Sequence, residues 1–117
     1  MKIKDNRGFT LIEIIIAIFI LVVALMGLAG VASTVISGNS FSKQITTATT
    51  LAQEKIEELS NTNYQSLADG TDTQNSIYTR TWTITLTAPH VKTIVVEVQW
   101  NHYGNSHDVT LKTMVTE

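Results

Sequence analysis

The chain opens with a long apolar segment and then becomes polar and mixed. Residues 9–32 read FTLIEIIIAIFILVVALMGLAGVA and hold one charged side chain, Glu13. As a helix this segment extends about 36 Å, enough to cross the roughly 30 Å hydrocarbon core of a bilayer. Lys2, Lys4 and Arg7 precede it. The positive-inside rule therefore predicts a cytoplasmic N-terminus and export of everything beyond residue 32.

The helical pattern continues beyond the apolar segment. Apolar residues recur there at three- or four-residue steps: Ile45, Ala48, Ala52, Ile56 and Leu59, with Leu51 beside them. Polar side chains lie largely off this stripe, which is typical of an amphipathic helix. We therefore expect one helix over about residues 9–59, apolar all round in its first half and amphipathic in its second.

The last third of the chain alternates between apolar and polar residues. This pattern predicts strands at residues 78–86, 93–100 and 107–115, and a fourth, short strand could lie between residues 64 and 77. The inward side chains are expected to be Tyr78, Trp82, Ile84, Leu86, Ile94, Val96, Val98, Trp100, Val109, Leu111 and Val115. Arg80 falls on the apolar face and needs a partner or an edge position.

Residues 61–117 are too few to bury a good core alone. The amphipathic stripe supplies the missing layer, because one helix on one antiparallel sheet makes a complete α+β unit. The sequence therefore predicts a long N-terminal helix packed on a small antiparallel sheet of three to four strands.

Composition excludes several function classes. The chain has 117 residues, a formal net charge of −2 and no cysteine. Without a basic excess, nucleic-acid binding is disfavoured as the main activity. Without cysteine there is no disulfide framework, thiol nucleophile or Cys-ligated zinc site. No phosphate-binding glycine loop or nucleophile elbow occurs.

The remaining candidate chemistry is sparse. His90, His102, His107 and Asp108 form the sole group that suggests a metal or acid–base site, and no third ligand at a zinc spacing accompanies them. We interpret these histidines as surface loop residues and expect neither metal nor cofactor. Trp82 and Trp100 fit a core pair on neighbouring strands better than a stacking platform.

Three interpretations compete for the apolar N-terminal segment. It is a plain membrane anchor, a secretory signal peptide cut before Ser33, or a processed anchor. A signal peptide normally has an apolar region of about 7–15 residues, so this one is too long. The stretch Arg7-Gly8-Phe9-Thr10-Leu11-Ile12-Glu13 resembles the type III signal of type IV prepilins, with its G-F-T-L-x-E pattern.

This resemblance to the type IV pilin and pseudopilin superfamily implies a specific maturation. Prepilin peptidase would cut between Gly8 and Phe9 and then N-methylate Phe9. The expected organisation of the chain is a leader at 1–8, a transmembrane half-helix at 9–32, an amphipathic half-helix at 33–60 and a β domain at 61–117. The chain would be a non-enzymatic, single-pass inner-membrane protein with an exported C-terminal domain that later enters a fibre.

Glu13 has a physical role to fill in this scheme. A carboxylate inside a membrane segment costs about 2.5–3.5 kcal/mol and is usually functional, although near the interface it simply reaches water. Cleavage after Gly8 creates an amine on Phe9, one helical turn from Glu13. The resemblance implies that the amine of an incoming subunit meets Glu13 of a neighbour and sets the register of the fibre. A buried pair of this kind specifies geometry more than it adds stability.

The subtype is less well defined by sequence. Many major type IVa pilins have a proline at the twenty-second mature residue, where this chain has Gly30, and a C-terminal disulfide that this chain lacks. Residues 51–59, LAQEKIEEL, resemble PilV-type minor pilins and I-type pseudopilins. Gly27 and Gly30 would give the helix flexibility on assembly, or would allow close helix packing. Alternatives are a major pilin of a Cys-free fibre, a membrane-anchored exported binding domain and a secreted enzyme.

Overall fold

The computed structural model describes residues 8–117. One long helix precedes a 3₁₀ turn and four strands: α1 (Leu11–Ser60), η1 (Tyr64–Ser66), β1 (Gly70–Gln74), β2 (Tyr78–Ala88), β3 (Val91–His102) and β4 (Asn105–Thr116). The chain divides into two compact units, one ending at Asn39 and the other comprising Ser40–Glu117. The α+β class with a long N-terminal helix is therefore confirmed.

Helix α1 begins two residues later and ends one residue later than the sequence pattern predicts. Up to Asn39 its apolar side chains are exposed, among them Ile16, Leu25 and Val31. The helix contains a stretch with a mean hydropathy of 3.1, which is long and apolar enough to cross a membrane. An exposed helix that is hydrophobic all round needs an apolar environment outside its own chain.

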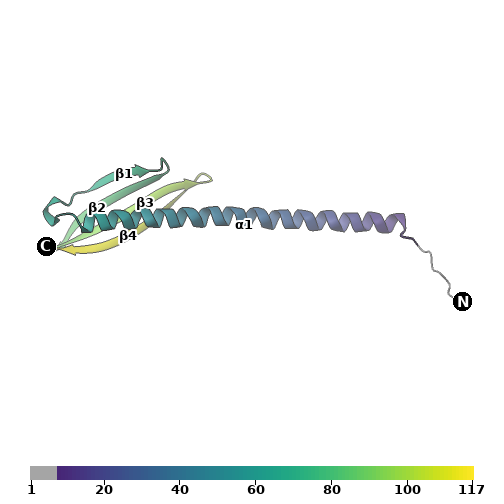
Figure 1. The fold of residues 1–117 in the computed structure, drawn as a ribbon, viewed down its shortest axis with the longest axis horizontal. Helices are drawn as coiled ribbons and strands as arrows, with labels where there is room; N and C mark the ends of the chain where they lie inside the picture. The colour runs from purple at the N-terminus through teal and green to yellow at the C-terminus, as the bar shows by residue number, and fades with distance from the viewer. Residues whose placement is uncertain (1–7) are drawn as a thin grey trace. The chain divides into compact units, whose positions relative to one another are not determined.

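The four strands form one antiparallel sheet in the order β1-β2-β3-β4 (Figure 1). This is the predicted meander, and β1 is the fourth strand that the sequence placed between residues 64 and 77. The structure extends the other three strands, because two-residue loops replace the longer connections expected around 87–90 and 101–106. Tyr103 and Gly104 close β3 onto β4 with positive φ angles of 48° and 78°, as a type I′ hairpin requires.

The core lies between the sheet and the part of α1 that follows Ser40. Its buried apolar residues are Ala48, Ala52, Leu59, Leu67, Tyr78, Ile94, Val96, Val98 and Trp100. All four inward residues predicted on β3 are buried. Leu86, however, is 66% exposed and Ile45 is 37% exposed, so their predicted inward positions are wrong. Leu86 lies near the end of its strand. On the helix, Ala48 and Ala52 rather than Ile45 face the sheet.

The two tryptophans do not form the expected pair. Trp82 lies opposite Val96, its indole N–H donates to the Ala68 carbonyl over 3.2 Å, and the Lys55 amine sits 3.8 Å from its ring centroid. A Cβ added at Gly70 would lie 2.4 Å from the same ring. The first residue of β1 therefore lies so close to the Trp82 ring that glycine is required there.

Trp100 belongs to a different part of the core. Its ring centroid is 6.0 Å from that of Tyr78, and its indole N–H donates to the Gln44 side chain over 3.1 Å. Each tryptophan therefore connects a separate turn of α1 to the sheet.

Arg80 has the partner that its position on the apolar face demanded. Its Nε donates to Asp72 on β1 over 2.8 Å and its Nη1 donates to the Leu51 carbonyl on α1 over 3.2 Å. The Arg80 side chain is 8% exposed and that of Asp72 is 31% exposed. The hydrogen bond from Arg80 holds the pKa of Asp72 below its usual value, so the ion pair joins β1, β2 and the helix.

We expect Asp72→Asn to destabilise the Ser40–Glu117 unit by about 1–3 kcal/mol at pH 7, because it leaves the buried Arg80 guanidinium without its charged hydrogen-bond partner. A carboxylate whose folded pKa is lowered stabilises the protein above its unfolded pKa of about 3.9, and this contribution is lost as pH falls through the folded pKa. Urea unfolding of the full chain in detergent, followed by tryptophan fluorescence at pH 7 and pH 3, measures both effects.

The exposed Asp108 supplies the matched control, since Asp108→Asn removes an acid that has no buried partner. We expect a smaller acid-dependent loss of stability in Asp72→Asn than in the wild type and in Asp108→Asn. Identical pH dependence in all three proteins would show that the Asp72–Arg80 pair does not contribute as described.

Candidate functional site

The predicted cleavage position lies before the helix, in irregular and exposed backbone. Gly8 precedes α1, and a Cβ placed on it would meet no atom within 4 Å. Phe9 is 80% exposed. The rest of the predicted leader, with Lys2, Lys4 and Arg7, lies outside the described residues. The Gly8–Phe9 peptide bond is therefore open to a peptidase in the described structure.

Thr10 fixes the start of the helix. Its hydroxyl accepts the backbone N–H of Glu13 over 3.2 Å, and its carbonyl accepts the N–H of Ile14 over 3.2 Å. Thr10 is thus the N-cap, and Thr10-x-x-Glu13 is the spacing of a capping box. This role was not predicted from the sequence, although a threonine three residues before a glutamate at the start of an apolar run is its recognised signal.

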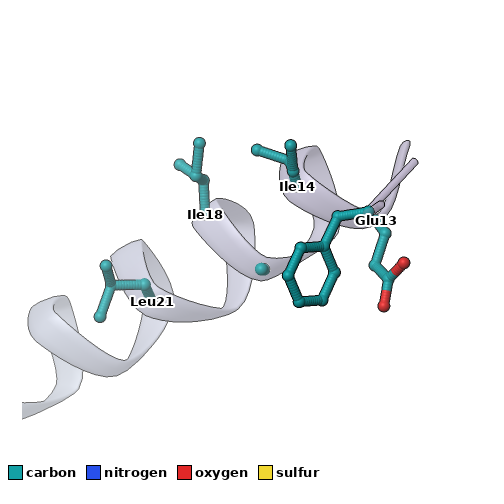
Figure 2. A pocket seen from close by; sticks show the side chains of 6 residues that line it. Glu13, Ile14, Ile18 and Leu21 are labelled. Carbon is teal, nitrogen blue, oxygen red and sulfur yellow. The ribbon is translucent and has the colours of Figure 1, made fainter. Parts of the chain in front are cut away.

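The cap also places Glu13 in the first turn of α1, where its negative charge is favourable beside the partial positive charge of the helix N-terminus. Glu13 and Phe9 line one shallow hollow of the helix surface, together with Ile14, Ala17, Ile18 and Leu21. Figure 2 shows the Glu13 carboxylate directed away from Ile14 and Ile18. The structure therefore brings the two predicted assembly residues to one end of the helix.

The chemistry available at this hollow is narrow. It offers one carboxylate, which accepts hydrogen bonds or attracts a cation, beside a wide apolar surface. No ion pair to Glu13 is formed among the described residues. Cleavage after Gly8 would create a cation on Phe9, which lines the same hollow as Glu13.

Gly27 and Gly30 lie further along α1 and both are helical. A Cβ at either position would meet nothing within 4 Å, so neither glycine is required by contacts inside the described chain. The Gly30 carbonyl additionally accepts the Thr34 hydroxyl over 3.1 Å. A threonine hydroxyl bound to the carbonyl four residues earlier slightly destabilises a helix and often bends it.

The histidines do not form a metal site among residues 8–117, where no group of three or more potential ligands occurs. His102 and His107 do approach each other, with ring centroids 6.3 Å apart, and both pack on Phe41 at 5.4 Å and 4.8 Å. They lie half-buried on strands rather than in loops, which corrects the interpretation from sequence. His90 is exposed and contacts Glu117 through Nδ1 at 2.6 Å.

Comparison with known proteins supports the N-terminal signal. Residues 3–29 match the family model described as the Prokaryotic N-terminal methylation motif. No curated protein and no solved structure matches the chain. The chain thus carries the prepilin-type cleavage and methylation signal of the type IV pilin and pseudopilin superfamily, and this match does not resolve the subtype.

Superfamily members are structural proteins and generally not enzymes. The signal implies processing by prepilin peptidase and assembly with other pilins. Together with the apolar helix, it indicates a membrane-anchored precursor that later enters a pilus.

Proposed function

We propose that this chain is a minor pilin or minor pseudopilin, a structural subunit of a type IV pilus or of a type II secretion pseudopilus. The methylation motif at residues 3–29 is the observation that carries the assignment to a pilin-type subunit. It ends within an apolar helix whose side chains are exposed, and a separate α+β unit follows. A major pilin of a Cys-free fibre and a membrane-anchored exported binding domain are the alternatives.

The proposed rank of minor subunit rests on sequence features. Removal of the eight-residue leader leaves 109 of the 117 residues, which is small for a pilin, and there is no cysteine to close a C-terminal loop. The segment 51–59 supplies both Leu59, which is buried in the core, and Leu51, whose carbonyl binds Arg80. Its resemblance to minor subunits therefore concerns residues that position the helix on the sheet.

Maturation is the first step of the proposed function. We propose that prepilin peptidase cuts between Gly8 and Phe9 and methylates the new amine. N-terminal sequencing of the exported protein tests this directly: N-methyl-Phe9 supports the proposal, a start at Ser33 indicates a secreted protein, and an intact Met1 indicates a plain anchor.

Gly8→Glu should abolish processing, because a long charged side chain would then lie beside the scissile bond. The uncut precursor should accumulate in the membrane, as a slower band on electrophoresis and as an intact N-terminus by mass spectrometry. Gly8→Ala is the matched control, since one methyl group fits the open surroundings of Gly8 and should leave most of the chain processed. Normal maturation of Gly8→Glu would overturn the cleavage assignment.

Assembly is the second step. We propose that the Phe9 amine of one subunit meets Glu13 of its neighbour, because both residues line the same hollow at the end of α1. The contact would neutralise two charges that are costly in an apolar surrounding. The neighbouring subunits would thereby be placed in one register along the fibre.

Glu13→Ala should leave cleavage intact and lower incorporation into sheared fibres by about ten-fold, because the amine then enters the fibre unpaired. Quantitative immunoblots of the fibre and membrane fractions measure the ratio. Glu13→Gln separates charge from shape: it keeps the size of the side chain and should assemble as poorly as Glu13→Ala. If either variant reaches wild-type levels in fibres, the proposed register role is wrong.

The helix itself must leave the bilayer. We propose that Gly27 and Gly30 make α1 easier to unwind locally at this stage, since each glycine destabilises a helix by about 0.8–1.0 kcal/mol relative to alanine. In the membrane the segment stays helical, because lipid cannot satisfy an unwound backbone. In the fibre, surrounding helices replace the lipid and a local opening becomes less costly.

Gly27→Ala combined with Gly30→Ala should stiffen the helix and shift subunits from the fibre to the membrane pool by several-fold. Gly38→Ala is the control, because Gly38 is also helical with open space around it but lies beyond the apolar segment. A fibre map with unbroken helix from Phe9 past Ser33 would contradict the opening and leave close helix packing as the role of both glycines.

A further inference from the structure

The two edge strands of the sheet differ in length and in how far other segments cover them. The β1 edge is five residues long, and the segment before it covers part of β2: Asp69 accepts the backbone N–H of Ile84 over 2.6 Å. Strand β4 forms the other edge over twelve residues. Among residues 8–117 no segment pairs with its outer side. A long strand edge without proline or bulge is a template for another strand.

The hairpin geometry shows which backbone groups of β4 are free. The two-residue loop leaves His102 opposite Asn105, and in such a loop this flanking pair is the hydrogen-bonded one. The bonded residues of β4 are therefore the odd-numbered ones. The even-numbered residues direct their N–H and C=O groups away from β3: Ser106, Asp108, Thr110, Lys112, Met114 and Thr116.

The side chains of β4 also form two distinct rows. On the helix side of the sheet, Val109, Leu111 and Val115 are half-buried and pack against the core, so their outer flanks remain partly uncovered. On the opposite face Asp108 and Lys112 are exposed and lie four residues apart. A strand that pairs with this edge must therefore place apolar side chains beside the first row. On the opposite face it must place a basic residue beside Asp108 and an acidic residue beside Lys112.

We propose that this edge pairs with β4 of a second copy of the chain, antiparallel about a two-fold axis at Thr110. In this register each Asp108 lies opposite the Lys112 of the second copy, and each Val109 lies opposite its Leu111. Both rows are then complementary at once. An axis at Asp108 or at Lys112 would instead place like charges opposite each other. This contact goes beyond the proposed function, because assembly of one fibre does not need it.

The direction of the helix decides where such a contact occurs. Phe41 packs on His107 near the start of β4, and Leu51 and Lys55 contact β2 at Arg80 and Trp82, farther along the helix. Through the strand register these positions match Val109 and Leu111 of β4, so α1 and β4 run the same way. The two-fold axis therefore makes the α1 helices of the two copies antiparallel to each other. Since all copies in one fibre share a direction, the contact joins copies in two fibres that lie side by side and run oppositely.

Single cysteines test the register, because the chain contains none. Opposite residues of a hydrogen-bonded antiparallel pair have Cα atoms about 5.5 Å apart, within disulfide range. Under copper-catalysed oxidation of the full chain in detergent, Thr110→Cys should give at least about five-fold more disulfide dimer than Thr116→Cys or Thr81→Cys. All three positions are exposed, and circular dichroism checks that each variant is folded.

Charge reversal tests the partner. In the Thr110→Cys background, Lys112→Asp or Asp108→Lys should each lower dimer yield several-fold, and the two changes together should restore it. Equal yields of disulfide dimer at positions 110, 116 and 81 would show that the cross-links form by random collision, and would overturn the proposal. So would failure of the double reversal to restore the dimer, or cross-linking of the Thr110→Cys variant to a different protein in preference to a second copy.

Discussion

The close contact of α1 with the sheet at Ala48 and Ala52 is the constraint on which the Ser40–Glu117 unit depends. Both alanines are completely buried, and beside them the Arg80 guanidinium donates to the Leu51 carbonyl of the same helix. The sheet alone has too little material for a core. Without this contact Ile94, Val96 and Val98 would lose their cover on one face, so the helix is part of the domain.

Much of this fold was predictable because its signals are local. Period-two alternation located β2, β3 and β4, and the apolar stripe located α1. Features that depend on contacts between distant segments were not predicted. Lys55 is 7% exposed, because Trp82 and Glu58 lie within reach of its amine. Asp72 as the partner of Arg80 likewise follows only from the pairing of β1 with β2.

The candidate site was predictable for a different reason. Gly8, Phe9 and Glu13 belong to a short linear motif, so residue order alone identifies them. The cap formed by Thr10 needed the additional observation of where the helix begins. The register role of Glu13 is not legible in one chain, because the cation it is proposed to meet belongs to a neighbouring subunit. One sequence therefore defines the processing signal better than the assembled contact.

The polar links between helix and sheet have a mechanical consequence. Gln44, Leu51 and Lys55 each engage a different partner, namely the Trp100 indole, the Arg80 guanidinium and the Trp82 ring. Sliding α1 by one turn, about 5.4 Å, would separate all three pairs at once. These three contacts therefore resist a force along the helix axis together. The unit is thereby built to follow its helix when the helix is pulled.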